Sequence, residues 1–307
     1  TKTNYGWRLL AAMVLGLVLN TARAQEYVGQ DRCVSCHEDQ AKSYMATNHG
    51  LVQDKASPAA QKGCESCHGA GSEHVRQAEN GEGKPGGIKV FSGALLTKDV
   101  HDLNQACLSC HDGDRRTMWK GSQHETRGLA CSSCHSIHKG IAANLAKENP
   151  TDICLDCHKK QRAELNKLSR HPIREGKVSC GDCHNPHGTV ADKMVSANTV
   201  NEKCYECHAE KRGPYLWEHA PVTEDCSNCH SPHGSTHDKL LKTKMPGLCQ
   251  RCHGVSRHPG TLYAKNPTQA DLEVYAASGN RLFYKSCRNC HGQIHGSNHP
   301  SGKLLNR

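Results

Sequence analysis

The chain has too few apolar and aromatic residues to build ordinary protein cores. Of its 307 residues, 36% are hydrophobic even when the cysteines are included, aromatic residues make up 4%, and only two phenylalanines are present. The mean hydropathy is −0.72, the value of a polar chain. A length that would otherwise suggest one or two domains therefore requires something other than side chains to fill the interior.

Long apolar runs are missing as well. The longest covers residues 9–19, whereas a helix needs about 20 apolar residues to cross a bilayer. Lys2 and Arg8 precede this run, and an Ala-x-Ala site at residues 22–24 follows it. This order predicts a secretion signal over residues 1–24; an uncleaved anchor lying on the membrane surface is the alternative.

Cysteine is abundant, and all twenty cysteines belong to ten copies of Cys-x-x-Cys-His. In this pattern two thiols bond to the vinyl groups of a haem and the adjacent imidazole binds the iron from one face. A zinc knuckle, a thioredoxin-like dithiol and a disulfide framework are alternatives for a Cys-x-x-Cys pair, but none of them requires the histidine. Only 23 of 307 residues are histidine, so ten matches in ten pairs are not chance. The sequence predicts ten covalently bound c-type haems.

The residues of these motifs form two sets. The haem-binding cysteines are Cys33, Cys36, Cys64, Cys67, Cys107, Cys110, Cys131, Cys134, Cys154, Cys157, Cys180, Cys183, Cys204, Cys207, Cys226, Cys229, Cys249, Cys252, Cys287 and Cys290. The proximal iron ligands are His37, His68, His111, His135, His158, His184, His208, His230, His253 and His291.

The spacing of the motifs indicates the fold class. About 28 residues separate successive proximal histidines, which leaves little polypeptide beyond what wraps each haem. We expect a multihaem cytochrome c fold that is mostly irregular, with short α-helices, almost no β-structure and an elongated, haem-packed chain. The mature chain, residues 25–307, is predicted to act in the periplasm, where c-type haem is attached.

A repeat of two haems runs through residues 25–307. Each repeat contains a first motif, a lone histidine, a second motif and a trailing histidine three to six residues after it. The five repeats cover approximately residues 31–80, 101–140, 150–190, 200–237 and 245–300. The lone histidines are His49, His124, His171, His219 and His258, and the trailing histidines are His74, His138, His187, His233 and His295.

These ten further histidines match the number of second ligands that ten bis-His irons need. His101 and His237 fall outside the pattern and are better explained as surface or propionate-binding residues, whereas His299 competes with His295 for one place. A trailing histidine is too close in sequence to reach the opposite face of its own porphyrin, so we expect it to ligate a neighbouring haem. Which further histidine serves which iron is left open by the sequence.

Two axial imidazoles leave an iron no open position for a substrate, which favours one-electron transfer over catalysis. Multihaem reductases often keep one haem open by replacing a proximal histidine with lysine, and no Cys-x-x-Cys-Lys occurs here. The sequence therefore predicts an electron carrier that is not an enzyme.

The net charge of +9 does not indicate nucleic-acid binding. Cleavage of the predicted signal leaves +6, and each oxidised bis-His haem adds about −1 through its propionates. Ten haems would bring the holoprotein to about −4. The lysines and arginines are better explained as partners of propionates than of phosphates.

A row of ten haems could bridge the ~30 Å core of a membrane if each advanced by about 3 Å. A polar chain cannot face lipid, so spanning would require a sheath such as a large β-barrel with a polar lumen.

Two segments carry a resemblance to a known family. Residues 204–254 (CYECHAEKRGPYLWEHAPVTEDCSNCHSPHGSTHDKLLKTKMPGLCQRCHG) and the C-terminal CRNCHGQIHGSNHPSGKLLNR resemble the periplasmic decahaem cytochromes of the MtrA/DmsE/PioA family. The resemblance implies a haem wire inserted into an outer-membrane porin of the MtrB/PioB kind, with the ten further histidines as distal ligands. It also implies periplasmic or inner-membrane cytochromes and an extracellular multihaem cytochrome as partners, for extracellular metal reduction or Fe(II) oxidation.

Two other functions remain open from the sequence. The two-haem repeat would equally serve a soluble periplasmic shuttle that supplies a terminal reductase. A multihaem oxidoreductase acting on a small nitrogen or sulfur compound is the third alternative, and it would require a five-coordinate haem.

Overall fold

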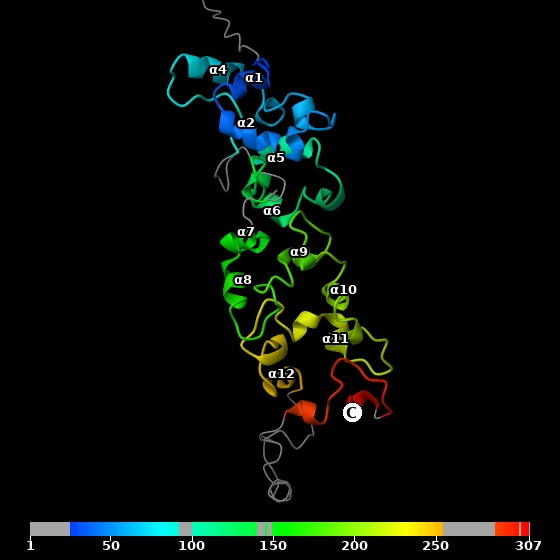
Figure 1. The fold of residues 1–307 in the computed structure, drawn as a ribbon. Coiled ribbons are helices and arrows are strands. Elements are labelled where there is room, and N and C mark those ends of the chain that lie inside the picture. Colours follow the sequence, from blue (N-terminus) through cyan, green and yellow to red (C-terminus); the bar gives the residue numbers. More distant parts are fainter. Residues whose placement is uncertain are drawn as a thin grey trace, which may run out of the picture. The chain divides into compact units, whose positions relative to one another are not determined.

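The computed structural model describes residues 25–91, 100–139, 145, 149–253, 286–300 and 302–306. The predicted signal at residues 1–24 and the lone histidine His258 lie outside these ranges. The described chain consists of short helices joined by turns and irregular segments, as Figure 1 shows. The α-helices are α1 (Gln30–Val34), α2 (Glu38–Met45), α3 (Glu65–His68), α4 (Ser72–Glu79), α5 (Val100–Leu108), α6 (Gln123–Thr126), α7 (Pro150–Cys157), α8 (Lys159–Glu164), α9 (Cys180–Cys183), α10 (Val200–Tyr205), α11 (Ala220–Glu224) and α12 (Gly247–Gln250).

Single turns of 3₁₀ helix alternate with these α-helices. They are η1 (Asn48–Gly50), η2 (Pro58–Ala60), η3 (Asp114–Arg116), η4 (Cys131–Ser133), η6 (Asp192–Met194), η7 (Ala209–Lys211), η8 (Cys226–Asn228), η9 (Asp238–Leu240), η11 (Cys287–Asn289) and η12 (Gly302–Leu304). No helix in the described ranges is both long and apolar enough to span a bilayer.

The described residues form no β-strand. The β-type pairing among them consists of isolated bridges, which are His135–Leu145, Ser169–Ser235, His184–Val195, Trp217–Ser297 and His230–Leu241. The predicted fold of short helices with almost no β-structure is therefore confirmed.

The chain divides into two compact units. Unit 1 comprises residues 1–92 and 137–141, and its described part contains α1 to α4 with η1 and η2. Unit 2 comprises residues 93–136 and 142–307, and it contains α5 to α12 with the remaining 3₁₀ turns.

The described part of neither unit has an extended apolar core. Among the described residues no large side chain is completely buried, and the buried apolar ones are scattered along the chain. They are Ala41 and Tyr44 in unit 1, and Val100, Trp119, Ala130, Leu165, Val195 and Leu305 in unit 2. The polypeptide alone thus buries little apolar surface, as its composition predicts.

In unit 2 one packing arrangement recurs. The helix that carries the first motif of a repeat contacts the short helix that begins at the first cysteine of the second motif: α5 contacts η4, α7 contacts α9, and α10 contacts η8. Each of these repeats is therefore a local structure in which two motifs face each other.

Candidate haem-binding sites

Each Cys-x-x-Cys-His motif forms a single helical turn. In all ten motifs the N–H of the histidine donates a hydrogen bond to the carbonyl of the first cysteine, at 2.9–3.1 Å. Residues three and four apart lie on the same face of a helical turn. The two thiols and the imidazole of each motif thus project to one side, the arrangement that covalent haem attachment requires.

Capping residues fix where several of these turns begin. The Asn149 side chain accepts a hydrogen bond from the N–H of Thr151 at the start of α7, and Pro150 occupies the first helical position. Ser179 and Asp182 form a reciprocal capping box around α9. Such caps typically stabilise a helix terminus by about 1 kcal/mol each, which matters for helices of one or two turns.

The histidine of the second motif is oriented by a loop that folds back onto it. His184 Nδ1 donates to the carbonyl of Lys193 at 2.9 Å, and His230 Nδ1 donates to the carbonyl of Lys239 at 2.8 Å. Lys193 and Lys239 both adopt left-handed backbone conformations, with φ of 58° and 56°. A hydrogen bond from Nδ1 fixes the tautomer and directs the lone pair of Nε2 outward for metal binding.

Among the described residues, eight pairs of imidazole rings lie close together, and each pair joins one proximal histidine to one of the further histidines. The ring centroids are 6.1 Å apart for His37–His74, 6.3 Å for His68–His138, 6.2 Å for His124–His158, 6.0 Å for His135–His187, 6.3 Å for His171–His208, 6.1 Å for His184–His233, 6.2 Å for His219–His253 and 6.2 Å for His230–His295.

These separations fit an iron between the two rings. Imidazole nitrogens lie about 2 Å from a bound transition metal, so two rings on opposite sides of one iron have centres about 6 Å apart. Ring stacking alone would produce a similar distance, but it would not select one proximal and one further histidine in every pair. The residues therefore fit a bis-His haem.

The pairs follow a rule along the chain. In the second to fifth repeats, the trailing histidine pairs with the proximal histidine of the second motif in the preceding repeat, as His187 does with His135. A lone histidine pairs with the first motif of the next repeat, as His171 does with His208. His74 differs, because it pairs with His37 of its own repeat.

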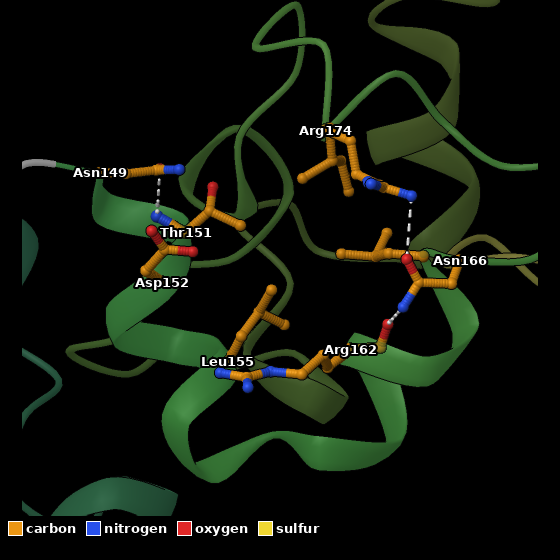
Figure 2. A pocket seen from close by; sticks show the side chains of 9 residues that line it. Asn149, Thr151, Asp152, Leu155, Arg162, Asn166 and Arg174 are labelled. Carbon is orange, nitrogen blue, oxygen red and sulfur yellow. Dashed lines mark hydrogen bonds between the residues drawn. The ribbon is translucent and has the colours of Figure 1, made fainter.

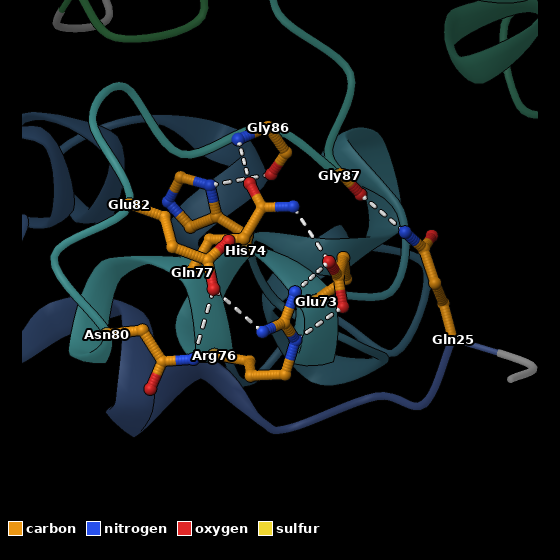
Figure 3. A network of polar contacts seen from close by, with 9 residues as sticks. All are labelled: Gln25, Glu73, His74, Arg76, Gln77, Asn80, Glu82, Gly86 and Gly87. Atoms are coloured by element: carbon orange, nitrogen blue, oxygen red, sulfur yellow. Dashed lines mark hydrogen bonds and ion pairs between the residues drawn. The ribbon is translucent and has the colours of Figure 1, made fainter.

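The loop that follows His74 is held to α4 by a polar network (Figure 3). His74 Nδ1 donates to the carbonyl of Gly86 at 3.0 Å, and Gln77 accepts from the Gly86 N–H at 2.6 Å. Glu73 accepts from both Arg76 and Gln77. This network sets the orientation of the His74 ring opposite His37.

Burial favours the neutral form of six of these imidazoles. Desolvation is the largest cause that lowers the pKa of His68, His158, His187, His219, His233 and His295. Neutral imidazole is the form that binds metal, so the same burial prepares these residues as ligands.

The first cysteines of the two motifs in a repeat also contact each other. The thiol of Cys107 hydrogen-bonds to Cys131, and the thiol of Cys204 hydrogen-bonds to Cys226, which together with burial raises the pKa of Cys107 and Cys204. In the haem-bound protein these sulfurs are thioethers, so their position is the informative feature. In these repeats the two cysteines would hold the attachment edges of their haems toward each other.

The other predicted ligands in the described ranges are His49, His111 and His291, and Nδ1 of His291 donates to the carbonyl of Leu304 at 2.6 Å. His49 lies in η1, and its carbonyl accepts a hydrogen bond from the Tyr44 hydroxyl at 2.8 Å. His111 and His291 close their motif turns like the other proximal histidines. His258 lies outside the described residues.

Of the two C-terminal candidates, His295 has its ring 6.2 Å from that of the proximal histidine His230. The backbone N–H of His299 donates to Ser297 at 3.0 Å, as that of His237 does to Ser235 in the preceding repeat. His299 thus occupies the place of His237, four residues after the trailing histidine.

Two groups of residues beside the motifs were not predicted. Asn104 and Asn201 are buried and link the two motifs of their repeats. Both lie three residues before a first cysteine, a repeated offset that could have identified them. Tyr44 and Trp119 pack against trailing histidines, with ring centroids 6.4 Å from His138 and 6.3 Å from His187.

A cavity of ≈ 290 Å³ lies beside α7 and α8 (Figure 2). Arg162 and Arg174 are part of its lining, and Asn166 accepts from Arg174 at 2.9 Å and donates to the carbonyl of Arg162 at 3.0 Å. Guanidinium groups bind carboxylates well, so this lining can accept a haem propionate.

These motifs and ring pairs define the chain as a multihaem c-type cytochrome that carries about ten haems and transfers electrons. The chain is 45% identical over 282 residues to the multihaem cytochrome MtrA of Shewanella baltica (strain OS185), an alignment that covers 91% of this chain and 81% of that protein. It belongs to the MtrA family of multihaem cytochromes.

Other comparisons support the class. A family model described as the doubled CXXCH motif matches residues 171–213 and 219–258, and one described as cytochrome c-type protein NrfB-like matches residues 64–146. The chain is 25% identical to the cytochrome c-type protein NrfB of Escherichia coli O6:H1 over 44% of this chain and 68% of that protein. It is 28% identical to the polyhaem cytochrome OmcB of Geobacter sulfurreducens (strain PCA) over 52% of this chain, but only 20% of OmcB is covered.

Proposed function

We propose that this chain carries electrons between the periplasm and the cell exterior, seated in an outer-membrane β-barrel porin of the MtrB/PioB kind. The observation that carries the proposal is the set of ring pairs, each of which joins one proximal and one further histidine at 6.0–6.3 Å. Family membership supports the same use, since 91% of the chain aligns with MtrA.

The proposed axial ligands are the ten proximal histidines together with the five lone and five trailing histidines defined above. Haem supplies reversible one-electron transfer when it is bound. Two imidazoles on each iron exclude a substrate from the coordination sphere, so the chain acts as a carrier and not as an enzyme. The twenty motif cysteines hold each haem covalently at a fixed place along the chain.

The exchange of histidines between repeats is what keeps the chain of sites continuous. His187 lies three residues after His184, yet its ring pairs with His135 of the preceding repeat. One short segment therefore supplies ligands to two different irons. This short linkage holds the two irons close together and limits their relative movement.

The proposed surroundings follow from the predicted secretion signal and from the family. The mature chain would reside in the periplasm in association with the outer membrane. Periplasmic or inner-membrane cytochromes would exchange electrons at one end and an extracellular multihaem cytochrome at the other. Bis-His ligation permits transfer in either direction, so extracellular metal reduction and Fe(II) oxidation are both compatible with it.

A soluble periplasmic shuttle is the second candidate function. The match of residues 64–146 to the family model described as cytochrome c-type protein NrfB-like supports this candidate. The shuttle would use the same ligands and haems, and it would differ only in lacking a permanent partner.

Extraction of outer membranes with a mild detergent separates the two candidates. The extract would be resolved by native electrophoresis, stained for haem, and analysed for proteins that migrate with this chain. A stable complex with a large barrel is expected. Recovery of the chain in the periplasmic fraction without a barrel would contradict the conduit and favour the shuttle.

A further inference from the structure

A carboxylate faces one of the trailing histidines. Glu164 ends α8, and its Oε2 lies 3.5 Å from Nδ1 of His233. The Glu164 side chain is only 13% exposed. The His233 ring is 6.1 Å from that of His184, so this carboxylate lies directly behind one ligand of a proposed bis-His pair.

Two arginines close to Glu164 in the sequence pair with other carboxylates. Arg162 pairs with Asp156 at 3.5 Å, and Arg170 pairs with Glu175 at 2.7 Å. A largely buried carboxylate requires a compensating positive charge or a strong donor. The proposed ligand His233 provides the donor, and a ferric haem core with its charge of about +1 provides the compensating charge.

The preceding repeat has the same backbone arrangement without the carboxylate. A Cβ on Gly234 would lie 2.0 Å from the carbonyl oxygen of Glu164, and one on Gly188 would lie 2.1 Å from that of Met118. Met118 therefore occupies the place of Glu164 behind His187. In the part of the chain that the structure describes, Nδ1 of His187 is buried and has no acceptor.

Other trailing histidines use neutral acceptors. His74 donates to the carbonyl of Gly86 and His138 to the carbonyl of Gln40, at 3.0 and 3.2 Å. The Nδ1 atoms of these chemically identical imidazoles therefore face a carbonyl at some sites, no acceptor at another and a carboxylate at a third. Because second-shell groups tune a metal site, this variation makes the sites energetically different.

We propose that Glu164 is a potential-setting residue, which lowers the reduction potential of the haem held by His184 and His233 relative to the haem held by His135 and His187. The inference rests on the proposed axial ligation of these four histidines.

Glu164 lowers the reduction potential of this haem through two effects. A hydrogen bond from Nδ1–H to a carboxylate increases the electron donation of the imidazole, which stabilises ferric over ferrous iron. The negative charge also favours the ferric core, because reduction removes its positive charge. Both effects oppose reduction at this site and leave the ligand set unchanged.

The test uses the purified holoprotein with all ten haems and the nearly isosteric variant E164Q. An EPR-monitored potentiometric titration should show one haem in ten shifted to higher potential, with altered g-values for one low-spin signal. The matched control is E175Q, which removes the same charge from an exposed carboxylate that pairs with Arg170 in the same repeat. E175Q should titrate like the wild type.

A titration of E164Q that superimposes on the wild type, or a shift to lower potential, would overturn the proposal. Haem content is measured first; if E164Q binds fewer than ten haems, E164D replaces it and should lie closer to the wild type than E164A. Failure of the ligation itself is recognised separately with H233A. This variant should contain one high-spin haem that added imidazole converts to low spin, and ten unchanged low-spin haems would refute the assignment of His233.

Discussion

Asn201 ties the first motif of the fourth repeat to the second. Its Oδ1 accepts a hydrogen bond from the backbone N–H of Cys226 at 2.7 Å, and its Nδ2 donates to the carbonyl of Val222 at 2.8 Å. Asn104 does the same in the second repeat, where it accepts from the N–H of Cys131 at 2.8 Å. Both side chains are buried, so these hydrogen bonds fix the second motif against the first.

Replacing Asn201 should therefore loosen one haem pair. N201A leaves a buried N–H of Cys226 without an acceptor, which costs about 1–3 kcal/mol of unfolding free energy. Urea unfolding of the holoprotein, followed through the haem absorbance, measures this loss. N228A is the control, because Asn228 makes one exposed hydrogen bond to Pro221 at 3.1 Å. Equal stability of N201A and N228A would contradict a clamping role for Asn201.

Gly234 is required by the close approach of two backbones. A Cβ there would lie 2.0 Å from the carbonyl oxygen of Glu164, and a backbone atom cannot move aside like a flexible side chain. G234A should destabilise the protein by about 1–3 kcal/mol and displace the neighbouring His233. Thermal unfolding and the low-spin haem spectrum check both effects. G113A, where a Cβ would meet no atom within 4 Å, should resemble the wild type.

His219 provides a direct test of the ring pairs. Its ring lies 6.2 Å from that of His253, so H219M should convert one bis-His haem to Met/His ligation and raise its potential. Protein-film voltammetry and EPR measure the change. H237A should leave the haem spectrum intact, since His237 belongs to no ring pair in the described chain. An unaltered voltammogram for H219M, or loss of a low-spin haem in H237A, would refute these assignments.

The pH dependence of α4 should reflect the pair formed by Glu73 and Arg76. Hydrogen bonds from Arg76 and Gln77 lower the pKa of Glu73 from 4.5 to about 2. The pair therefore stabilises the folded helix fully above pH 4.5 and loses this contribution as the pH falls through about 2. Because the Glu73 side chain is 35% exposed and that of Arg76 47%, solvent screens the pair and the effect should be small and local. Amide hydrogen exchange should be faster in α4 of E73Q than of the wild type at pH 6, with no change in α8.

The sequence was sufficient to predict the haems and the short helices; the individual ligand residues that it indicates stay predictions. Spacing also predicted that a trailing histidine such as His187 serves a different haem from that of its own motif, a prediction that ligation experiments still have to test. The pairing could not be predicted, because it depends on how irregular segments fold back between repeats. His74 illustrates the difficulty: a longer spacing and a glycine-rich loop turn it toward His37 of its own repeat.

Residues that act through the ligands were harder to find. Asn201 and Asn104 share an offset from their motifs, but only two of the five repeats have an asparagine at that position, so the signal is weak. Glu164 has no signal at all, because its role depends on a contact with a residue 69 positions away. Such contacts are set by packing around the porphyrins, which the order of residues does not encode locally.

The ring pairs overlap along the chain of unit 2. The segment of chain between His124 and His158 overlaps with the segment between His135 and His187, and that one overlaps with the segment between His171 and His208. Further pairs continue this overlap to His230–His295. Any single break of the backbone between residues 124 and 295 therefore separates at least one proposed ligand pair. A protease nick would leave two fragments still joined through iron, and no repeat could be deleted or transplanted without opening a coordination site in its neighbour. During secretion from the N-terminus, the haem at His135 would stay incomplete until residue 187 had crossed the inner membrane.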